Sequence, residues 1–357
     1  IAVIPPDFTR GIAFSQNFPS NRTVYIGAYA AGIQITNDGG TSFTSPNWGI
    51  SQTNVQNIRT TKGAPNQVSA IAAHFAHVSN DGGHNWLKLN DPFPMDREVI
   101  SYVEPNELWV FGKQLSLDDF DGRVAYSLDG GDTFLEPKAL NTVMPSDPEY
   151  IVRYNDALDM PTYMATGNDG IFISNSIGGP WTSVLSELVG PSGGGGPALW
   201  PSDAPERAMI AKGGSVYLSF DGGLTWSDPH VLDSLDEIAK TLFASDGTAF
   251  AVTTAGRLFR SDTGKVWTEV VTDSVYTHQH YAILPAQVYE AQTRPDFEEY
   301  REILIGTHAG VYVVTDSEKP SISRWSGWQI VDNKADFVHC HGCPDGLTEP
   351  NNEPYAE

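Results

Sequence analysis

The protein has 357 residues, of which 44 are acidic and 21 are basic, so its formal net charge is −23 at pH 7. A field of that sign repels phosphate backbones and anionic lipid surfaces, which argues against general nucleic-acid or membrane-surface binding. The chain is 40% apolar and 18% charged, as globular proteins are. It also lacks an uncharged apolar run of about 18 residues, which excludes a membrane-spanning helix and membrane insertion.

An eight-residue motif recurs along the chain. Its clear copies begin at Thr36, Ser79, Ser127 and Ser219, contain Asp-Gly-Gly and end on Phe or Trp. Weaker copies lie at 174–181 and 260–267, and an eroded seventh copy lies at 315–328. The third positions of the first six copies are 41 to 48 residues apart. Self-similarity at such a period is typical of repeat architectures.

The motif has the chemistry of a hairpin turn. An Asp that follows an extended segment accepts hydrogen bonds from backbone amides just after it. The two glycines supply the positive φ of a tight hairpin, and the final aromatic residue packs back over the turn. We therefore predict a structural and not a catalytic role for the motif carboxylates, which are Asp38, Asp81, Asp129, Asp221 and Asp262.

Each motif is accompanied by short apolar segments with a period of two. In chain order, examples of the segments before a motif are 12–14, 24–27 and 33–35, and examples of the segment after one are 86–89 and 267–270. Four such strands fill a unit of about 45 residues, which is the size of a propeller blade. The sequence thus predicts an all-β, seven-bladed β-propeller of four-stranded antiparallel blades over residues 1–335. Only 233–242 has a helical signal.

With this motif and period, the sequence resembles the BNR or Asp-box repeat family of β-propellers, whose motif reads Ser/Thr-x-Asp-x-Gly-x-Thr-Trp/Phe. Residues 18–43 also resemble the units of secreted bacterial members. The family includes sialidases, xyloglucan-cleaving hydrolases, sortilin-like receptors and photosystem assembly factors. The resemblance therefore implies the fold and an extracellular, cell-surface or periplasmic location, but it does not fix an activity.

The enzymes of this family carry signatures that are not found here. Sialidases resemble one another in an arginine triad and in a Phe/Tyr-Arg-Ile-Pro motif, whereas this chain begins Ile-Ala-Val-Ile-Pro without the Arg. Arginines on or near the expected inner strands are more simply interpreted as salt bridges or surface charges than as an anion site. They are Arg10, Arg59, Arg97 and Arg153. No catalytic residue is assigned.

The expected topology places the repeat turns on one face and sends eight of the nine histidines to the other face. His74 and His77 are expected in a loop between the second and third strands of their unit. Five histidines belong to the last unit or to the tail that leaves it, namely His278, His280, His308, His339 and His341. Together with Cys340 and Cys343 they provide imidazole and sulfur groups, which are common ligands of Zn²⁺ and copper.

The competing and favoured interpretation of the tail is a local Cys340–Cys343 disulfide in an oxidising compartment, beside exposed histidines. The two interpretations are compatible if only imidazoles bind the metal. A second cation candidate is the loop at 115–122, whose carboxylates Asp118, Asp119 and Asp121 are ligand types for Ca²⁺. A solvated acidic turn is the favoured interpretation of that loop. Residues 336–357 are expected to form a tail that leads, through a linker rich in Pro, Asn and Glu, to a larger chain or assembly.

Three functions follow as hypotheses. The favoured one is a non-enzymatic binding module that presents the face opposite the repeat turns to a protein or polysaccharide partner. The second is a sialidase- or xyloglucanase-like glycoside hydrolase whose carboxylates lie at the centre of that face. The third is a metal-binding protein that uses the histidines of the last unit.

Overall fold

The structure is a computed structural model of the whole chain. It describes all residues except 1–8, 30, 62, 74, 91–98, 105, 114–121, 136–147, 154–162, 168–169, 177–179, 187–197, 200–205, 234–235, 271–286, 318–319, 326–327, 331–336 and 340–357.

The chain folds into antiparallel sheets of consecutive strands. The first sheet contains β1 (Thr9–Phe14), β2 (Val24–Ala28) and β3 (Gly32–Thr36), and the second contains β4 (Val55–Thr61), β5 (Ala64–Ala72), β6 (Phe75–Ser79) and β7 (Leu87–Lys88). The third contains β8 (Val99–Glu104), β9 (Glu107–Lys113) and β10 (Gly122–Ser127), and the fourth contains β11 (Pro148–Arg153), β12 (Tyr163–Gly167), β13 (Gly170–Ser174) and β14 (Thr182–Leu185).

The second half of the chain continues in the same way. The fifth sheet contains β15 (Ala198–Leu199), β16 (Ala208–Lys212), β17 (Ser215–Ser219) and β18 (His230–Val231), and the sixth contains β19 (Ile238–Phe243), β20 (Ala249–Thr253), β21 (Leu258–Ser261) and β22 (Thr268–Glu269). The seventh contains β23 (Val288–Thr293), β24 (Glu302–Thr307), β25 (Gly310–Thr315) and β26 (Ser321–Arg324). A two-stranded sheet of β27 (Trp328–Ile330) and β28 (Phe337–His339) follows.

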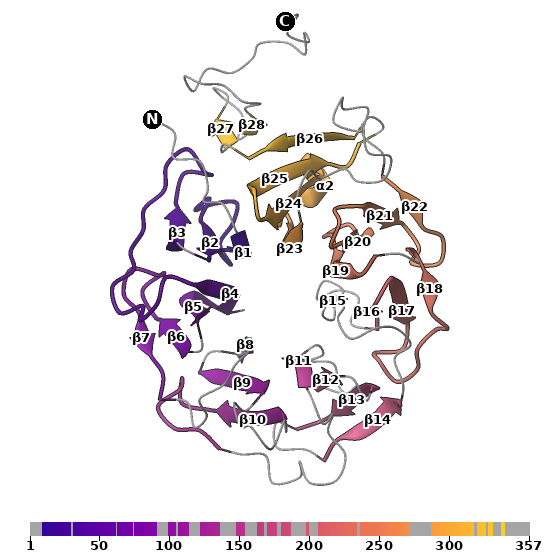
Figure 1. Cartoon of the computed structure of the whole chain (residues 1–357), viewed down its shortest axis with the longest axis horizontal. Helices are drawn as coiled ribbons and strands as arrows, with labels where there is room; N and C mark the ends of the chain where they lie inside the picture. The colour runs from indigo at the N-terminus through magenta and orange to yellow at the C-terminus, as the bar shows by residue number, and fades with distance from the viewer. Residues whose placement is uncertain are drawn as a thin grey trace, which may run out of the picture.

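The sheets stand side by side in a ring, and the first strand of each sheet lies innermost (Figure 1). Several second strands are buried along their whole length, as are β2 and β20, where every residue is buried. Such burial on both faces arises because each sheet is covered by a neighbour on either side. The sequence places short apolar strands next to one another, and the ring therefore buries its core between sheets.

Each junction between neighbouring sheets has its own apolar or aromatic contacts. The junction of the seventh sheet with the first packs Leu304, Val313 and Trp325 against Ile12 and Ile26. The innermost strands β1 and β23 also contact each other there. Because the first and last sheets pack together in this way, the ring is closed.

The expectation of an all-β protein built from antiparallel sheets is confirmed. The expectation of helix at 233–242 is wrong for residues 238–242, because residues 238–243 form the inner strand β19. The helix that the structure describes is α2 (Phe297–Tyr300), which precedes β24. No helix in the described part of the chain is long and apolar enough to cross a membrane. The pairing of β27 with β28 spans the boundary that the sequence suggested after residue 335.

Four copies of the octapeptide form the same turn between the third strand of a sheet and the segment that follows. In the second sheet, Ser79 Oγ donates to Asp81 Oδ1 at 2.7 Å and accepts the Gly83 N–H at 2.8 Å. The Asn85 backbone N–H donates to Asp81 Oδ1 at 2.9 Å, and its side chain donates to Oδ2 at 2.6 Å. The corresponding bonds recur around Asp38, Asp129 and Asp221. Each carboxylate therefore closes its own turn.

Two physical constraints require a glycine at the second glycine position of the turn. Gly83 has φ +87°, and a Cβ at this position would lie 2.6 Å from Ile35 Cδ1 of the preceding sheet. Gly131 has φ +98°, and its Cβ would lie 2.6 Å from Leu89 Cδ2. A side chain at either position would be strained by the left-handed backbone and by the close approach. The turn thus also packs one sheet against the sheet before it.

The turn role expected for a fifth carboxylate, Asp262, is wrong. Its side chain is 65% exposed and pairs with Arg260, whose Nη2 lies 2.6 Å from Asp262 Oδ1. Thr263, and not Asp262, stands two residues after Ser261 here, and its Oγ1 accepts the Lys265 N–H at 3.2 Å. Ser261 keeps its role by accepting the Gly264 N–H at 2.8 Å.

The turn bonds predict a specific response to acid. Burial tends to raise the pKa of Asp81, but hydrogen bonds from Asn85, Ser79 and His84 outweigh it and lower the pKa to about 2. Hydrogen bonds from Ser127 and Thr133 lower the pKa of Asp129 to about 2 as well. Because these folded-state pKa values lie below those of the unfolded chain, the stability they contribute is present above about pH 4 and is lost as the pH falls towards 2.

We therefore expect the free energy of unfolding to fall between pH 4 and pH 2, and to fall less steeply in the Asp81→Asn variant. In that window the variant should take up fewer protons on unfolding than the wild type, by at most about one. Urea unfolding at a series of pH values measures both slopes. Asp262→Asn is the matched control, since its carboxylate bonds Arg260 and not the turn. If Asp262→Asn changed the slope as much as Asp81→Asn, the assignment of this acid sensitivity to the turn would be wrong.

Candidate functional site

Five inner strands contain a β-bulge next to their first paired residue. The register shifts lie between Thr9 and Gly11, Val55 and Asn57, Pro148 and Tyr150, Ile238 and Lys240, and Val288 and Glu290. The extra residues are Arg10, Gln56, Glu149, Ala239 and Tyr289. A bulge re-aims a side chain and is common next to functional sites. Period-two sequence patterns do not reveal this shared feature.

The bulges lie towards the face opposite the repeat turns. Thr9, for example, pairs with Ala28, which ends β2 just before the connection to β3. The repeat turns lie at the other ends of the strands, where Thr36 ends β3. The bulged residues therefore surround the centre of the ring on the side that sequence reasoning favours for binding.

Two bulged residues, Arg10 and Tyr289, meet at the junction of the first and seventh sheets. The Arg10 guanidinium carbon lies 4.7 Å from the centroid of the Tyr29 ring and 5.0 Å from that of the Tyr289 ring. Both distances are within the range of cation–π attraction. Arg10 Nε is buried without a hydrogen-bond partner among the described residues. Tyr29 is 45% exposed, so this group, which we call the Arg10 cluster, reaches the surface.

The Arg10 cluster is linked to one of the predicted metal ligands. Tyr289 Oη donates to Gln287 Oε1 at 3.3 Å. The Gln287 backbone N–H donates to His308 Nδ1 at 3.1 Å. His308 lies in the connection between β24 and β25, on the same side of the ring as the bulges. The structure thus places His308 beside an aromatic and cationic surface.

A buried carboxylate and two cations lie further along the inner strands. The Glu290 side chain is 3% exposed, and its Oε2 lies 3.3 Å from Lys240 Nζ and 3.4 Å from Arg59 Nη1. Together with Arg10, the strands β1, β4, β19 and β23 contribute three cations and this one carboxylate. These four strands therefore carry a local excess of positive charge, although the protein has a net charge of −23. Such a site attracts an anionic group by field focusing.

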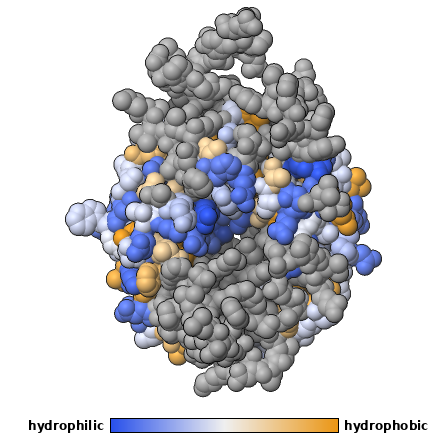
Figure 2. All heavy atoms as spheres, viewed as in Figure 1, coloured by the Kyte–Doolittle hydropathy of each residue, from blue (hydrophilic) through white to orange (hydrophobic). Residues whose placement is uncertain are grey.

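The hydropathy of the described surface is consistent with a polar centre of the ring. Figure 2 shows hydrophilic residues gathered around the middle of the face in view, with more hydrophobic residues scattered towards its edges. Arg10 and Arg59, which sequence reasoning considered for an anion-binding triad, contact different groups. Arg97 and the side chain of Arg153 lie outside what the structure describes.

One histidine needs correction. His77 was expected in a loop, but it lies in β6 and is fully buried. Its Nδ1 lies 2.9 Å from the Phe75 carbonyl oxygen, and Nε2 accepts the Ser51 N–H at 3.2 Å. Burial lowers the pKa of His77 below its usual value. Both ring nitrogens therefore serve the packing of the second sheet.

Most of the predicted metal and disulfide residues lie outside the described part of the chain. They are His278, His280, Cys340, His341, Cys343, Asp118, Asp119 and Asp121. Of the remaining two, His308 is in the connection described above and His339 ends β28, where its backbone pairs with Trp328. Among the residues that are described, no group of three or more His, Cys, Asp or Glu is placed to hold a metal ion.

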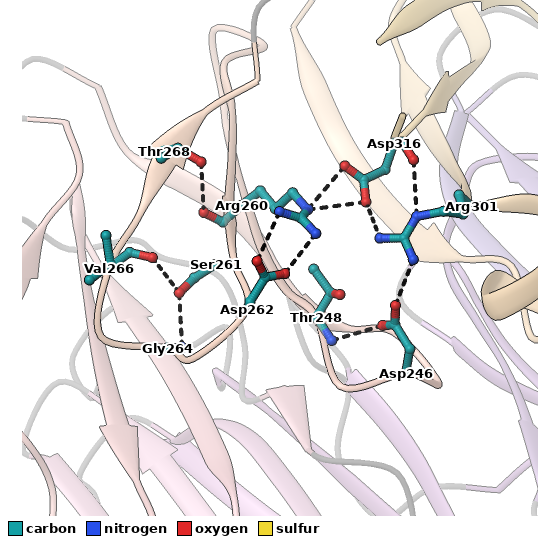
Figure 3. A network of polar contacts seen from close by, with 10 residues as sticks. All are labelled: Asp246, Thr248, Arg260, Ser261, Asp262, Gly264, Val266, Thr268, Arg301 and Asp316. Atoms are coloured by element: carbon teal, nitrogen blue, oxygen red, sulfur yellow. Dashed lines mark hydrogen bonds and ion pairs between the residues drawn. The ribbon is translucent and has the colours of Figure 1, made fainter. Parts of the chain in front are cut away.

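A second polar cluster ties the sixth and seventh sheets together on the repeat-turn face (Figure 3). Asp316 is 5% exposed and receives Arg260 Nε at 3.1 Å and Arg301 Nη2 at 2.6 Å. Arg301 Nη1 continues the chain of contacts to Asp246 at 2.8 Å. Because each charge here has an opposite partner, we interpret this cluster as a structural connection between sheets.

Comparison with known proteins identifies the fold. No family model matches the sequence, and no curated protein sequence matches it. Solved structures do match. YCF48 from Cyanidioschyzon merolae superposes with a TM-score of 0.59 at 16% identity, over 87% of this chain and 96% of that one. A structure of YCF48 bound to D1 peptide gives 0.61 at 13% identity, over 89% and 96%.

An enzyme shares the same architecture. The GH74 xyloglucanase from Xanthomonas campestris superposes with a TM-score of 0.64 at 14% identity, over 89% of this chain but only 53% of the enzyme. At such identities the likeness concerns the fold alone, since one fold hosts many activities. The chain has the fold of a β-propeller.

Proposed function

We propose that this protein is a non-enzymatic binding propeller of the Asp-box type, which presents the face opposite the repeat turns to a partner protein or glycan. Seven sheets of three or four strands in the described structure support a count of seven blades. In the first and third sheets a single bridge, Ile35–Thr44 or Tyr126–Leu135, stands where the fourth strand would be. The resemblance of residues 18–43 to secreted members supports an extracellular, cell-surface or periplasmic location.

The observation that carries the proposal is the Arg10 cluster. An exposed tyrosine, a second tyrosine and a guanidinium whose Nε has no partner among the described residues form the kind of aromatic and cationic surface that dominates binding interfaces. Between the two partner classes we favour a protein segment, because a propeller of the same fold has been solved with a bound peptide. The Arg10 guanidinium favours a segment that brings a carboxylate.

Peptide and glycan arrays probed with the intact chain test this proposal, followed by affinity measurement on the best hit. Tyr29→Ala is expected to weaken binding at least about tenfold, which corresponds to about 1.4 kcal/mol and is typical of an interface anchor. Phe220→Ala is the matched control, because Phe220 is also an exposed aromatic residue (43%, against 45% for Tyr29) but belongs to a repeat turn. If Phe220→Ala lost binding and Tyr29→Ala retained it, the partner would bind the repeat-turn face and the proposed face would be wrong. If neither array gave a binding signal, the proposal would be contradicted.

The two alternative functions have their own tests. A glycosidase needs two carboxylates about 5 to 9 Å apart. Glu290 is instead held by Lys240 and Arg59. Hydrolysis of chromogenic glycosides or xyloglucan by the purified chain would overturn the non-enzymatic proposal. The proposed metal site of the last unit is tested by elemental analysis for zinc and copper, and the Cys340–Cys343 bridge by the mass change on reduction.

A further inference from the structure

A pocket of about 290 Å³ lies where the inner strands β1, β4 and β23 reach the repeat-turn face. One wall is apolar and is formed by Phe14, Phe18 and Pro295. Phe14 and Phe18 hold each other in place by an edge-to-face contact with 4.9 Å between ring centroids. Arg59 and Gln292 lie on the polar side. The pocket is separate from the Arg10 cluster, which lies towards the opposite face.

Some of the polar groups of the pocket are already satisfied within the protein. Thr60 Oγ1 donates to the Phe14 carbonyl at 2.9 Å and accepts Gln16 Nε2 at 3.1 Å. Thr293 Oγ1 donates to the Phe243 carbonyl at 3.1 Å. These hydroxyl groups fix the ends of the inner strands. They are therefore poor candidates for holding a ligand.

Arg59 retains hydrogen-bonding capacity. Its bonds to the Ile58 carbonyl at 3.0 Å and to Glu290 at 3.4 Å both use Nη1. Among the described residues, neither Nε nor Nη2 has a partner, and the Arg59 side chain is 30% exposed. The Gln292 amide, half-buried in β23, likewise has no hydrogen-bond partner there. A guanidinium with two donors available in one plane matches the two oxygens of a carboxylate.

The charge around the pocket favours the same ligand. Lys240 and Arg59 share the single carboxylate of Glu290, which leaves one positive charge without a counter-ion in this group. An anion that binds at Arg59 would supply the missing charge in a partly buried place, where attraction is screened less than at the surface. The apolar wall would be covered by an apolar group of the same ligand.

We propose that this pocket binds a carboxylate that carries an apolar group about as large as an amino-acid side chain. Arg59 binds the two carboxylate oxygens, Gln292 donates a further hydrogen bond, and the apolar group packs against Phe14, Phe18 and Pro295. The volume, at the lower end of ligand pockets, limits the occupant to this size. Two sources supply this chemistry: a free organic acid and the C-terminal residue of a peptide.

Calorimetric titration of the full chain with phenylacetate tests the proposal, and phenylacetamide is the uncharged control ligand. We expect phenylacetate to bind and phenylacetamide to bind at least tenfold more weakly. A short peptide that ends in Phe with a free carboxylate, compared with its amidated form, distinguishes the sources. Tighter binding of the free-carboxylate peptide than of phenylacetate indicates a peptide terminus, and the reverse indicates a free acid. If neither phenylacetate nor the free-carboxylate peptide bound, the proposal would be overturned.

The protein variants make the test specific. Arg59→Gln is expected to weaken binding at least tenfold, and Lys240→Gln should weaken it clearly less, because it removes the surplus positive charge but leaves the two donors of Arg59 in place. Both variants remove one cation from Glu290, but only Arg59 lines the pocket. Equal weakening by the two variants would contradict a site at Arg59.

Two more variants separate the possible failures. If Arg59→Gln does not fold, as judged by circular dichroism, Gln292→Leu takes its place and should weaken binding of phenylacetate several-fold; unchanged binding in that variant would overturn the proposal. Tyr29→Ala should bind phenylacetate as the wild type does, because Tyr29 belongs to the Arg10 cluster. The pocket and the proposed partner surface on the other face can therefore fail independently.

Discussion

Replacing Trp109 with alanine is expected to lower the free energy of unfolding by about 3–5 kcal/mol, the usual cost of truncating a buried aromatic side chain. Trp109 lies in β9 and is fully buried. Its ring lies 6.2 Å from Tyr163 and 6.4 Å from Trp181, both of the fourth sheet, in edge-to-face contacts. Tyr163 in turn donates to Glu107 at 2.9 Å. Trp109 is thus the centre of the junction between the third and fourth sheets.

Urea unfolding of the full chain measures this cost, and Trp48→Ala provides the control. Trp48 is 80% exposed, so its truncation should change stability by no more than about 0.5 kcal/mol. Trp109→Phe should cost less than Trp109→Ala, because it keeps a ring in place and removes an indole Nε1 that is buried without a partner in the described structure. Equal effects of Trp109→Ala and Trp48→Ala would show that this junction does not limit stability.

The features that sequence reasoning found are those whose contacts lie close together in the chain. The Asp81 turn is one: Ser79, Asp81, Gly83 and Asn85 are within seven residues, and their hydrogen bonds reproduce the spacing of the motif. The failure at Asp262 has a local cause as well. Asp262 directly follows Ser261, whereas the other turn carboxylates stand two residues after the serine or threonine, so Thr263 and not Asp262 accepts the turn amide of Lys265.

The candidate site was not found because its geometry depends on strands that are distant in sequence. The bulges at Arg10 and Tyr289 become visible only when each inner strand is paired with its neighbour. Likewise, Arg59 and Glu290 are 231 residues apart and meet only because the ring closes. His77 was misplaced by the shift of a strand boundary, since β6 begins at Phe75. A period-two pattern locates strands but not the register that decides where each side chain points.

Arg294→Met is expected to lower the free energy of unfolding by about 3–5 kcal/mol, because it removes the cation from a buried ionic group. Arg294 is fully buried, with Nη1 2.7 Å from Glu302 Oε2 and Nε 2.6 Å from Asp296 Oδ1. Its guanidinium carbon also lies 3.6 Å from the centroid of the Tyr300 ring. The Glu302 side chain is only 8% exposed, so in the variant its charge stays desolvated and loses the ion pair with Arg294.

A comparison with Arg260→Met shows whether the loss of stability is specific to the buried Arg294 or follows from removing any arginine that bonds carboxylates. Arg260 also bonds two carboxylates, but its side chain is 28% exposed, and Asp316 keeps Arg301 when Arg260 is removed. That variant should cost less than Arg294→Met, about 1 kcal/mol, because Arg260 is partly exposed and Asp316 keeps its ion pair with Arg301. Adding Glu302→Gln to Arg294→Met should recover part of the loss, because the buried side chain that has lost the guanidinium is then neutral. If the double variant were no more stable than Arg294→Met, the lost packing against Tyr300, and not the charge left on Glu302, would be the cause of the destabilisation.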